Sequence, residues 1–431
     1  KDQKAETEIE VQNDKEKIYI TGGYPLKGTV KTSGAKNAAL PLMALSLILN
    51  KGLTLLNIPN LADTRLMSKL LIQLGININW TYDKVECNGH PKINEASYDL
   101  VRKMRASILV LGPLLTSFGS ARVPLPGGCA IGARPIDLHL LVMESLGANI
   151  KYDSGFIIAS IGSEGLKGSV IDFPKVSVGA TESAIMTAVL AKGETKILNA
   201  AHEPEIIDLA KCLTSAGANI KGAGTGTIII NGVKKLNPVC HDIVPDRIEA
   251  GSFAIASAIT KGNIEINNIR PNDLEFFLQI LKFTGCEVNI NKNSINVSSS
   301  KRPISYNITT ESHPGFPTDL QAQYMALMSI ADGNCYVKET IFENRFMHVP
   351  ELLRMGANIT TDNQTATIMG VKNLYASKVM ASDLRASMSL ILGALVASGT
   401  SEIDGIHHLD RGYEKIEDKL SNLGAIINRS K

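Results

Sequence analysis

The most reactive side chain that the sequence offers is a thiol in a glycine-rich segment. Cys129 lies within Gly127–Arg134, which holds three glycines and an arginine. The glycines predict a flexible loop that exposes the thiol, and the nearby guanidinium favours the thiolate. We therefore expect Cys129 to act as a nucleophile or as a general acid. As a nucleophile it would need a histidine base, and the nearest one in the sequence, His139, follows ten residues later.

A second set of candidates consists of cations that precede apolar segments with helical patterning. Lys36 with Asn37 precedes the first segment, and Arg105 precedes the second. A helix N-terminus has unpaired N–H groups and the positive end of the dipole, so it attracts anions and disfavours cations. An anionic ligand is one reason to place cations there, and solvated salt bridges are the alternative. Polar or charged residues also precede the other four segments: Ser177–Thr181, Asp246-Arg247, Asp319, and Asp383 with Arg385. For Ser177 and Asp383, plain N-capping of the helix is the alternative.

Two loop arginines complete the charged candidates. Arg345 and Arg411 lie at equivalent places in Phe342–His348 and His407–Glu414. Their planar guanidinium groups suit a bidentate grip on phosphate or carboxylate, and a pair of solvated arginines is the alternative. Neither the histidines nor the six cysteines have the spacing of a metal site, so no metal is predicted. For the cysteines other than Cys129, a buried and inert thiol is expected.

These candidates belong to a repeated unit. A short signature with a central glycine recurs at spacings of 68 to 72 residues, at Gly75, Gly147, Gly217, Gly285, Gly356 and Gly424. Six units of about 70 residues are too long for a solenoid and predict small α/β units. Each contains an apolar helix, a strand, an amphipathic helix that ends at the repeated glycine, and a hairpin.

The apolar helices predict how the units assemble. They are apolar nearly all round, so three of them should pack together as the core of one domain. The 431 residues then form two domains of three units, with the break in Lys234–Pro245. A hydrophobic content of 44% argues against disorder, and a net charge of +2 argues against a basic surface that binds nucleic acid. The apolar runs are too short to span a membrane, and reduced cytoplasmic thiols are expected.

With these residues in view, the chain resembles the enolpyruvyl transferase family from about Ile18 to Arg429. The motifs of the first half are Ser33–Ala38, Met104–Ser107, Pro126–His139 and Val176–Thr181, and those of the second are Phe316–Asp319, Glu343–Val349 and Asp410–Glu414. The resemblance implies an inside-out α/β barrel of two domains, each with three copies of one unit. It places residues 36–244 in one domain and residues 1–35 with 245–431 in the other. It implies no metal and no organic cofactor.

The resemblance also implies a reaction and its residues. It points to the branch that transfers enolpyruvyl from phosphoenolpyruvate to the 3′-hydroxyl of UDP-N-acetylglucosamine, with release of phosphate. Cys129 matches the proton donor, which also forms a covalent adduct, and Asp319 matches the residue that receives the hydroxyl proton. The positions that match phosphoenolpyruvate contacts are Lys36, Asn37, Arg134 and Arg411. Those that match nucleotide-sugar contacts are Arg105, Arg134, Pro135, Ile136, Asp137, Leu138, Lys175, Val176, Ser177, Val178, Asp319 and Ile341.

Several alternatives remain at this point. A sister enzyme that acts on shikimate 3-phosphate shares the expected fold, but its loop should lack the Gly-Gly-Cys sequence. An RNA-processing enzyme with a related α/β unit is disfavoured by the neutral charge and by few aromatic residues. A catalytically inactive binding protein is disfavoured by the complete set of charged motifs. In the preferred interpretation, fosfomycin alkylates Cys129, and the sequence makes no prediction of the oligomeric state.

Overall fold

The computed structural model describes residues 16–126 and 136–430, so Cys129, Arg134 and Pro135 lie outside the described residues. Its internal contacts divide these residues into two compact units. Unit 1 comprises residues 16–33 and 245–430, and unit 2 comprises residues 34–126 and 136–244. The chain passes between the units at Ser33–Gly34 and again at Val244–Pro245. In the part of the chain described here, no helix combines the length and the apolar character that a membrane crossing requires.

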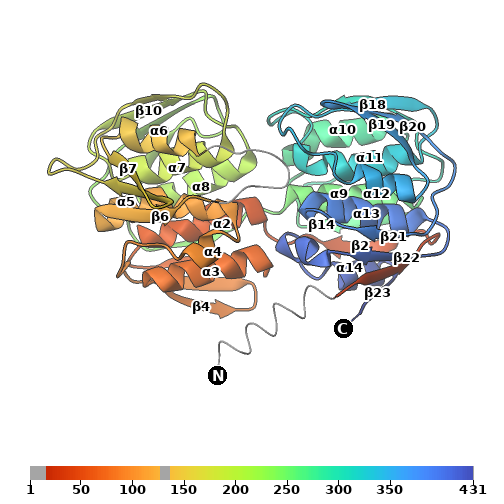
Figure 1. Ribbon diagram of the computed structural model, residues 1–431, viewed down its shortest axis with the longest axis horizontal. Coiled ribbons are helices and arrows are strands. Elements are labelled where there is room, and N and C mark those ends of the chain that lie inside the picture. Colours follow the sequence, from red (N-terminus) through yellow and green to blue (C-terminus); the bar gives the residue numbers. More distant parts are fainter. Residues whose placement is uncertain (1–15, 127–135, 431) are drawn as a thin grey trace. The chain divides into compact units, whose positions relative to one another are not determined.

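Unit 2 is built around three apolar helical segments (Figure 1). These inner segments are α2 (Lys36–Ala44) with η1 (Leu45–Leu47), η2 (Arg105–Val110) with α5 (Leu111–Phe118), and α7 (Val178–Ala188). The other helices are α3 (Ala62–Leu74), α4 (Tyr98–Val101), α6 (Asp137–Ser145) and α8 (Pro204–Ser215). Most positions of the inner segments are buried because they are apolar or small on nearly every side.

The described strands of unit 2 form three sheets. The first has the order β13 (Val239–Asp242), β3 (Leu53–Leu56), β5 (Lys84–Asn88) and β4 (Asn77–Thr81). The second has the order β6 (Ser120–Pro124), β8 (Phe156–Ser160) and β7 (Asn149–Asp153). The third has the order β11 (Asn219–Lys221), β12 (Thr227–Asn231), β10 (Glu194–Leu198) and β9 (Val170–Asp172).

Unit 1 repeats this plan with a core of its own. Its inner segments are α9 (Arg247–Ile259), η4 (Thr318–Leu320) with α11 (Gln321–Ser329), and α13 (Leu384–Val396). The other helices are η3 (Pro271–Leu274), α10 (Glu275–Phe283), α12 (Val349–Arg354), η5 (Ile406–Arg411) and α14 (Ile416–Asn422). Figure 1 shows that the inner helices of each unit have strands around them, which is the inside-out arrangement expected from the sequence.

The described strands of unit 1 also form three sheets. The first has the order β21 (Lys378–Met380), β22 (Thr400–Asp404), β1 (Ile18–Thr21) and β23 (Ile426–Arg429). The second has the order β15 (Glu287–Ile290), β16 (Ser294–Ser298), β14 (Asn263–Asn267) and β2 (Lys27–Lys31). The third has the order β17 (Ile308–Thr309), β18 (Asn334–Lys338), β20 (Thr365–Met369) and β19 (Asn358–Asp362).

Three strands complete repeats from which they are distant in sequence. β1 pairs antiparallel with β22 and β23, so a strand near the start of the chain completes the last repeat. β2 pairs in parallel with β14 and thus supplies the first strand of the fourth repeat. In unit 2, β13 pairs in parallel with β3 in the same way. The sequence predicted a local hairpin in every unit, and in the last repeat β1 replaces one of its strands.

The repeated glycines have the predicted role. All six have a backbone φ between 94° and 109°, a left-handed conformation that only glycine adopts without strain. Each follows an outer helix and lets the chain turn directly into a strand. One prediction about the cysteines was wrong, because Cys240 is exposed on the edge strand β13. Side chains alternate across a strand, so this thiol points away from the core that covers Val239.

Candidate functional site

In unit 2 the first inner helix begins at a buried ion pair. Lys36 is the first residue of α2, and its Nζ lies 2.9 Å from a carboxylate oxygen of Asp63 in α3. The side chains are 11% and 4% exposed, so little water screens the pair. The N-cap position of α2 holds Ala35, whose methyl group cannot accept a hydrogen bond from the helix. The cation predicted at this helix start is therefore present, with a buried carboxylate beside it.

The second and third inner segments of unit 2 begin around a buried histidine. His139 in α6 contacts the Ser183 hydroxyl of α7 through Nδ1 at 2.7 Å. Burial, with a smaller contribution from the charge of Arg105, lowers the pKa of His139 to about 4. Arg105 is the first residue of η2, and its effect on His139 places its charge near α6. Because His139 is neutral and buried, it is poorly placed to serve as an exposed general base.

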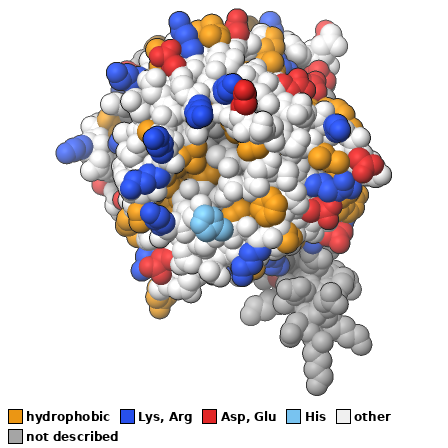
Figure 2. Space-filling model, turned by 90° about the vertical axis from the view of Figure 1, so that its left-hand side faces the viewer, with side chains coloured by type: hydrophobic (Ala, Val, Ile, Leu, Met, Phe, Trp, Pro, Cys, Tyr) orange, Lys and Arg blue, Asp and Glu red, His pale blue; other side chains and the backbone are white. Residues whose placement is uncertain are grey.

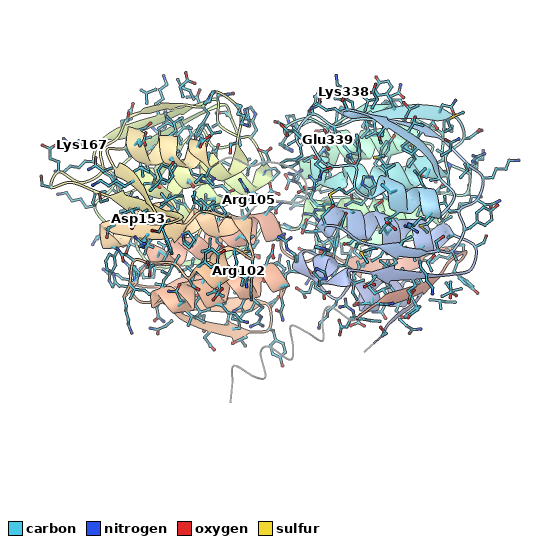
Figure 3. All side chains as sticks on the ribbon, viewed as in Figure 1. Arg102, Arg105, Asp153, Lys167, Lys338 and Glu339 are labelled. Atoms are coloured by element: carbon cyan, nitrogen blue, oxygen red, sulfur yellow. The ribbon has the colours of Figure 1, made fainter. Side chains whose placement is uncertain are left out.

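The segments predicted to hold the nucleotide sugar lie at two further helix starts of unit 2. Ser177 caps α7 by accepting a hydrogen bond from the Ala180 N–H at 3.2 Å. Lys175 and Val176 are exposed just before it, as a ligand-binding segment requires. Ile136 is the N-cap of α6, Asp137 is exposed, and Leu138 is buried. Figure 3 labels Arg105 at the start of the second inner segment.

A buried acid lies on the same inner helix of unit 2. Glu182 in α7 is 4% exposed, and its Oε2 has no hydrogen-bond partner. Burial raises the pKa of Glu182 well above its usual value, and the charges of Glu205 and Glu203 raise it further. The protein environment of Glu182 therefore favours the protonated form of this side chain. Within residues 16–126 and 136–430, no three His, Cys, Asp or Glu side chains are arranged to hold a metal ion.

In unit 1 a carboxylate lies between two arginines. One oxygen of Asp319, in η4, lies 3.0 Å from a guanidinium nitrogen of Arg345, and the other lies 3.5 Å from Arg385. Both arginines are buried, whereas the Asp319 side chain is 24% exposed. Asp319 thus remains accessible while its two partners are fixed in the protein. This is the geometry of a positioned carboxylate.

The arginines are themselves held by neighbouring groups. Arg345 donates from Nη1 to the Thr318 hydroxyl at 3.0 Å, and Arg385 donates to the Tyr413 hydroxyl at 3.3 Å. Burial opposes the charge of Arg385, but Asp319 and Tyr413 outweigh it and raise the pKa of that guanidinium. The alternative of a solvated loop arginine is therefore wrong for Arg345. Arg411, the last residue of η5, is partly buried.

The structure adds residues that the sequence did not identify. The Tyr413 hydroxyl is within 2.8 Å of the Ser252 hydroxyl and accepts from the Gln323 amide at 3.1 Å. Gln323 also donates to the backbone carbonyl of Asp319, and its bonds to Ser252 and Tyr413 connect α11 with α9 and, through Arg385, with α13. Asp63 was likewise missed, although an acid in the first turn of an amphipathic helix is a detectable signal. Nothing in the sequence shows which charges pair, because the partners lie 26 to 66 residues apart.

Unit 1 therefore brings together Asp319, Arg345 and Arg385, with Ile341 connected to them through Glu339. Unit 2 brings Arg105 near His139 and pairs Lys36 with Asp63. Both acidic and basic side chains occur on the face of unit 2 in Figure 2, which agrees with the near-neutral net charge. The described residues thus provide a carboxylate with two arginines, and several cations at helix starts.

Comparisons with known proteins show the family to which the chain belongs. The EPSP synthase (3-phosphoshikimate 1-carboxyvinyltransferase) family matches residues 20–420. UDP-N-acetylglucosamine 1-carboxyvinyltransferase of Geobacter metallireducens is 53% identical and covers 96% of this chain and 100% of its own. The enzyme of the same name from Zymomonas mobilis is 49% identical, with coverages of 96% and 99%.

Solved structures show the same fold. The enolpyruvyl transferase NikO of Streptomyces tendae gives a TM-score of 0.86 at 23% identity, over 96% of this chain and 99% of its own. EPSP synthase of Acinetobacter baumannii gives a TM-score of 0.75 at 17% identity, over 96% and 100%. The fold is that of the enolpyruvyl transferases, which confirms the predicted fold class. The chain belongs to this enzyme family, and the relatives at about half identity carry the name of its nucleotide-sugar branch.

Proposed function

We propose that the chain transfers the enolpyruvyl group of phosphoenolpyruvate to the 3′-hydroxyl of UDP-N-acetylglucosamine. Near-complete coverage at 49% and 53% identity to enzymes of that name carries the proposal. The sister reaction with shikimate 3-phosphate is disfavoured, because the EPSP synthase structure is only 17% identical. Such a transferase acts at the start of peptidoglycan synthesis, and we place it in the cytoplasm, where both substrates are made.

The proposed chemistry is an addition followed by an elimination. The sugar oxygen bonds to C2 of phosphoenolpyruvate, C3 receives a proton, and the hydroxyl proton goes to Asp319. Phosphate and a proton from C3 then leave, which restores the carbon–carbon double bond. Arg345 and Arg385 support this role of Asp319, since they fix both carboxylate oxygens while leaving the group accessible.

We assign the cations of both units to the anionic substrates. Lys36, Asn37, Arg134 and Arg411 would contact phosphoenolpyruvate, and the position of Lys36 as the first residue of α2 supports this for Lys36. Arg105, residues 134–138, residues 175–178, Asp319 and Ile341 would hold the nucleotide sugar. The exposure of Lys175, Val176 and Ile341 is consistent with this assignment. The proposed reaction uses no metal and no organic cofactor.

Cys129 is the proposed donor of the proton to C3 and the site of covalent modification. The measurement is the intact mass of the protein after incubation with fosfomycin and the nucleotide sugar. We expect the mass to rise by one drug molecule in the parent and to stay unchanged in Cys129→Ala. An unchanged mass in the parent would refute the assignment.

One assay tests the function as a whole. Phosphate release is measured with both substrates for the parent, Cys129→Ala and Asp319→Ala, and with shikimate 3-phosphate in place of the sugar. We expect release that depends on UDP-N-acetylglucosamine, together with a loss of at least about a hundredfold in each variant. Full activity in both variants would overturn the mechanism, and release that depends on shikimate 3-phosphate would overturn the substrate.

A further inference from the structure

The acid that organises the Asp319 region is Glu339, which directly follows β18 (Figure 3). It is 1% exposed and accepts five hydrogen bonds. Its Oε1 accepts from the Thr318 hydroxyl at 2.8 Å and from the Gln321 amide at 3.4 Å. Such a dense set of donors accounts for a buried carboxylate that forms no ion pair within residues 16–126 and 136–430.

The Oε1 contact fixes the direction of the Thr318 hydroxyl. Since that hydroxyl gives its proton to Glu339, its lone pairs are free to accept from Arg345, at 3.0 Å. Arg345 in turn holds Asp319 at 3.0 Å through its other terminal nitrogen. The Gln321 amide that reaches Glu339 also donates to the Arg345 carbonyl at 3.1 Å. Glu339 is thus connected to Asp319 through a continuous chain of hydrogen bonds.

The Oε2 contacts shape the following loop. This oxygen accepts from the backbone N–H groups of Ile341 and Phe342, at 2.9 and 3.3 Å. The Thr310 hydroxyl donates to the same oxygen at 2.9 Å and so joins the loop to the neighbouring segment. Ile341 remains 38% exposed at the surface of the unit. One carboxylate therefore organises two parts of the proposed site.

We propose that Glu339 is a positioning residue for the transfer, with one function for each oxygen. Oε1 aligns Thr318 and Arg345 so that Asp319 is held ready to accept a proton, and Oε2 holds Ile341 for the nucleotide sugar. This inference rests on the proposed function, because it assigns Glu339 to the same reaction.

Glu339→Gln separates the two functions. Two backbone N–H groups face Oε2 and cannot accept, so the amide oxygen of the glutamine must take that place. The amide NH2 then points at Thr318, whose hydroxyl must accept from it and compete with Arg345. We expect kcat to fall about ten- to hundredfold, which is the effect of one hydrogen bond to a charged group. The Kd for UDP-N-acetylglucosamine, from calorimetry without phosphoenolpyruvate, should stay within about twofold, which is less than one ordinary hydrogen bond is worth.

Three companion variants test each connection. Thr318→Val should lower kcat to the same extent, and Thr318→Ser, which retains the hydroxyl, should restore it to within about threefold, less than the loss of one charged hydrogen bond. The Glu339→Gln/Thr318→Val double variant should be no slower than the worse single variant, because both break the same connection. Glu339→Ala should also weaken nucleotide-sugar binding about tenfold, since two backbone donors lose their acceptor. Glu287→Gln, an exposed acid in β15, serves as the matched control with parent-like kinetics.

The outcomes distinguish this inference from the proposed function. If the parent releases no phosphate from the two substrates, the proposed function itself fails. If the parent is active and Glu339→Gln keeps its kcat, only the role of Glu339 is refuted. Losses that multiply in the double variant would likewise refute the hydrogen-bonded connection. A lower melting temperature with unchanged kcat and Kd in the folded fraction would show a purely structural residue and would also overturn the proposal.

Discussion

Each unit buries one lysine–carboxylate pair near the place where the chain passes between the units, and the two pairs differ in their surroundings. In unit 2, Lys36 and Asp63 meet at the uncapped start of α2. In unit 1, Lys419 pairs with Glu249, which also accepts from the backbone N–H of Ser33 at 3.1 Å. Lys419 also donates to the Ser33 hydroxyl at 3.0 Å. The second pair thus fixes the backbone, whereas the first lies at a helix start whose N-cap residue, Ala35, provides no side-chain cap.

Two helix starts in each unit show the same contrast. In unit 1, Asp246 and Asp383 cap α9 and α13, and each side chain accepts two backbone N–H groups. In unit 2, neither α2 nor η2 has a side-chain cap, and cations stand at their first positions. Capping stabilises a helix, and a cation at its start does the opposite. Unit 2 therefore gives up local stability at the positions where we assign anionic substrates.

The largest expected effect comes from breaking the pair of unit 2. Lys36→Met leaves the Asp63 carboxylate buried without its cation, so the free energy of unfolding should fall by about 3–5 kcal/mol. The measurement is urea denaturation, with hydrogen exchange to locate the change in unit 2. Lys36→Met/Asp63→Asn is the control, and removal of the charge should restore more than half of the loss. A single variant as stable as the parent would show that the pair is not a stabilising feature of this unit.

The second prediction uses pH to compare a buried histidine with a buried acid. His139 in unit 2 has a pKa of about 4, so between pH 6.5 and 4 the unfolded chain binds a proton that the folded chain does not. The contribution of His139 to the free energy of unfolding therefore has its full value above pH 6.5, and it falls by about 3 kcal/mol as the pH decreases to 4. Glu249 in unit 1 changes stability in the opposite direction, because its raised pKa lets the folded chain keep a proton between pH 4.5 and 7.

Two variants isolate these slopes. In His139→Gln, the free energy of unfolding should no longer fall as the pH decreases from 6.5 to 4. In Glu249→Gln, it should no longer decline as the pH rises from 4.5 to 7. The measurement is the urea midpoint from pH 4 to 8 for each variant and for the parent. Parallel curves for parent and His139→Gln would mean that His139 has the same pKa in the folded and in the unfolded chain.

The contrast between the units also shows what could be predicted from sequence. The repeat and its turns are local, so Gly75 and its five equivalents predicted six units and the ends of six outer helices. The candidate helix starts were found in the same way, from charges next to apolar segments. β1, β2 and β13 could not be assigned to their sheets, because pairing across hundreds of residues has no local pattern. Pairs such as Lys36–Asp63 depend on that same long-range packing.

The third prediction concerns the pair of unit 1. Burial raises the pKa of Glu249, Lys419 lowers it and Asp246 raises it again, which results in a value of about 7. The attraction to Lys419 acts only on the ionised carboxylate. Lys419→Met should therefore cost about 2 kcal/mol at pH 8, the value of a hydrogen bond to a charged group, and clearly less at pH 6. A cost that is equal at both pH values would show that Glu249 is ionised throughout this range, as in an ordinary buried ion pair.

The smallest expected effects compare one cap from each unit. The Asp383 carboxylate accepts from the N–H groups of Arg385 and Ala386, whereas the Ser177 hydroxyl accepts only from Ala180. Asp383→Ala should cost about 1–2 kcal/mol and Ser177→Ala about 0.5–1 kcal/mol. Thermal unfolding measures both, and hydrogen exchange assigns each loss to α13 or to α7. Ser177 also belongs to the proposed nucleotide-sugar site. Bound UDP-N-acetylglucosamine should therefore enlarge the loss of stability caused by Ser177→Ala and leave the loss caused by Asp383→Ala unchanged. If the ligand changed both costs equally, Ser177 at the start of α7 would not belong to the nucleotide-sugar site.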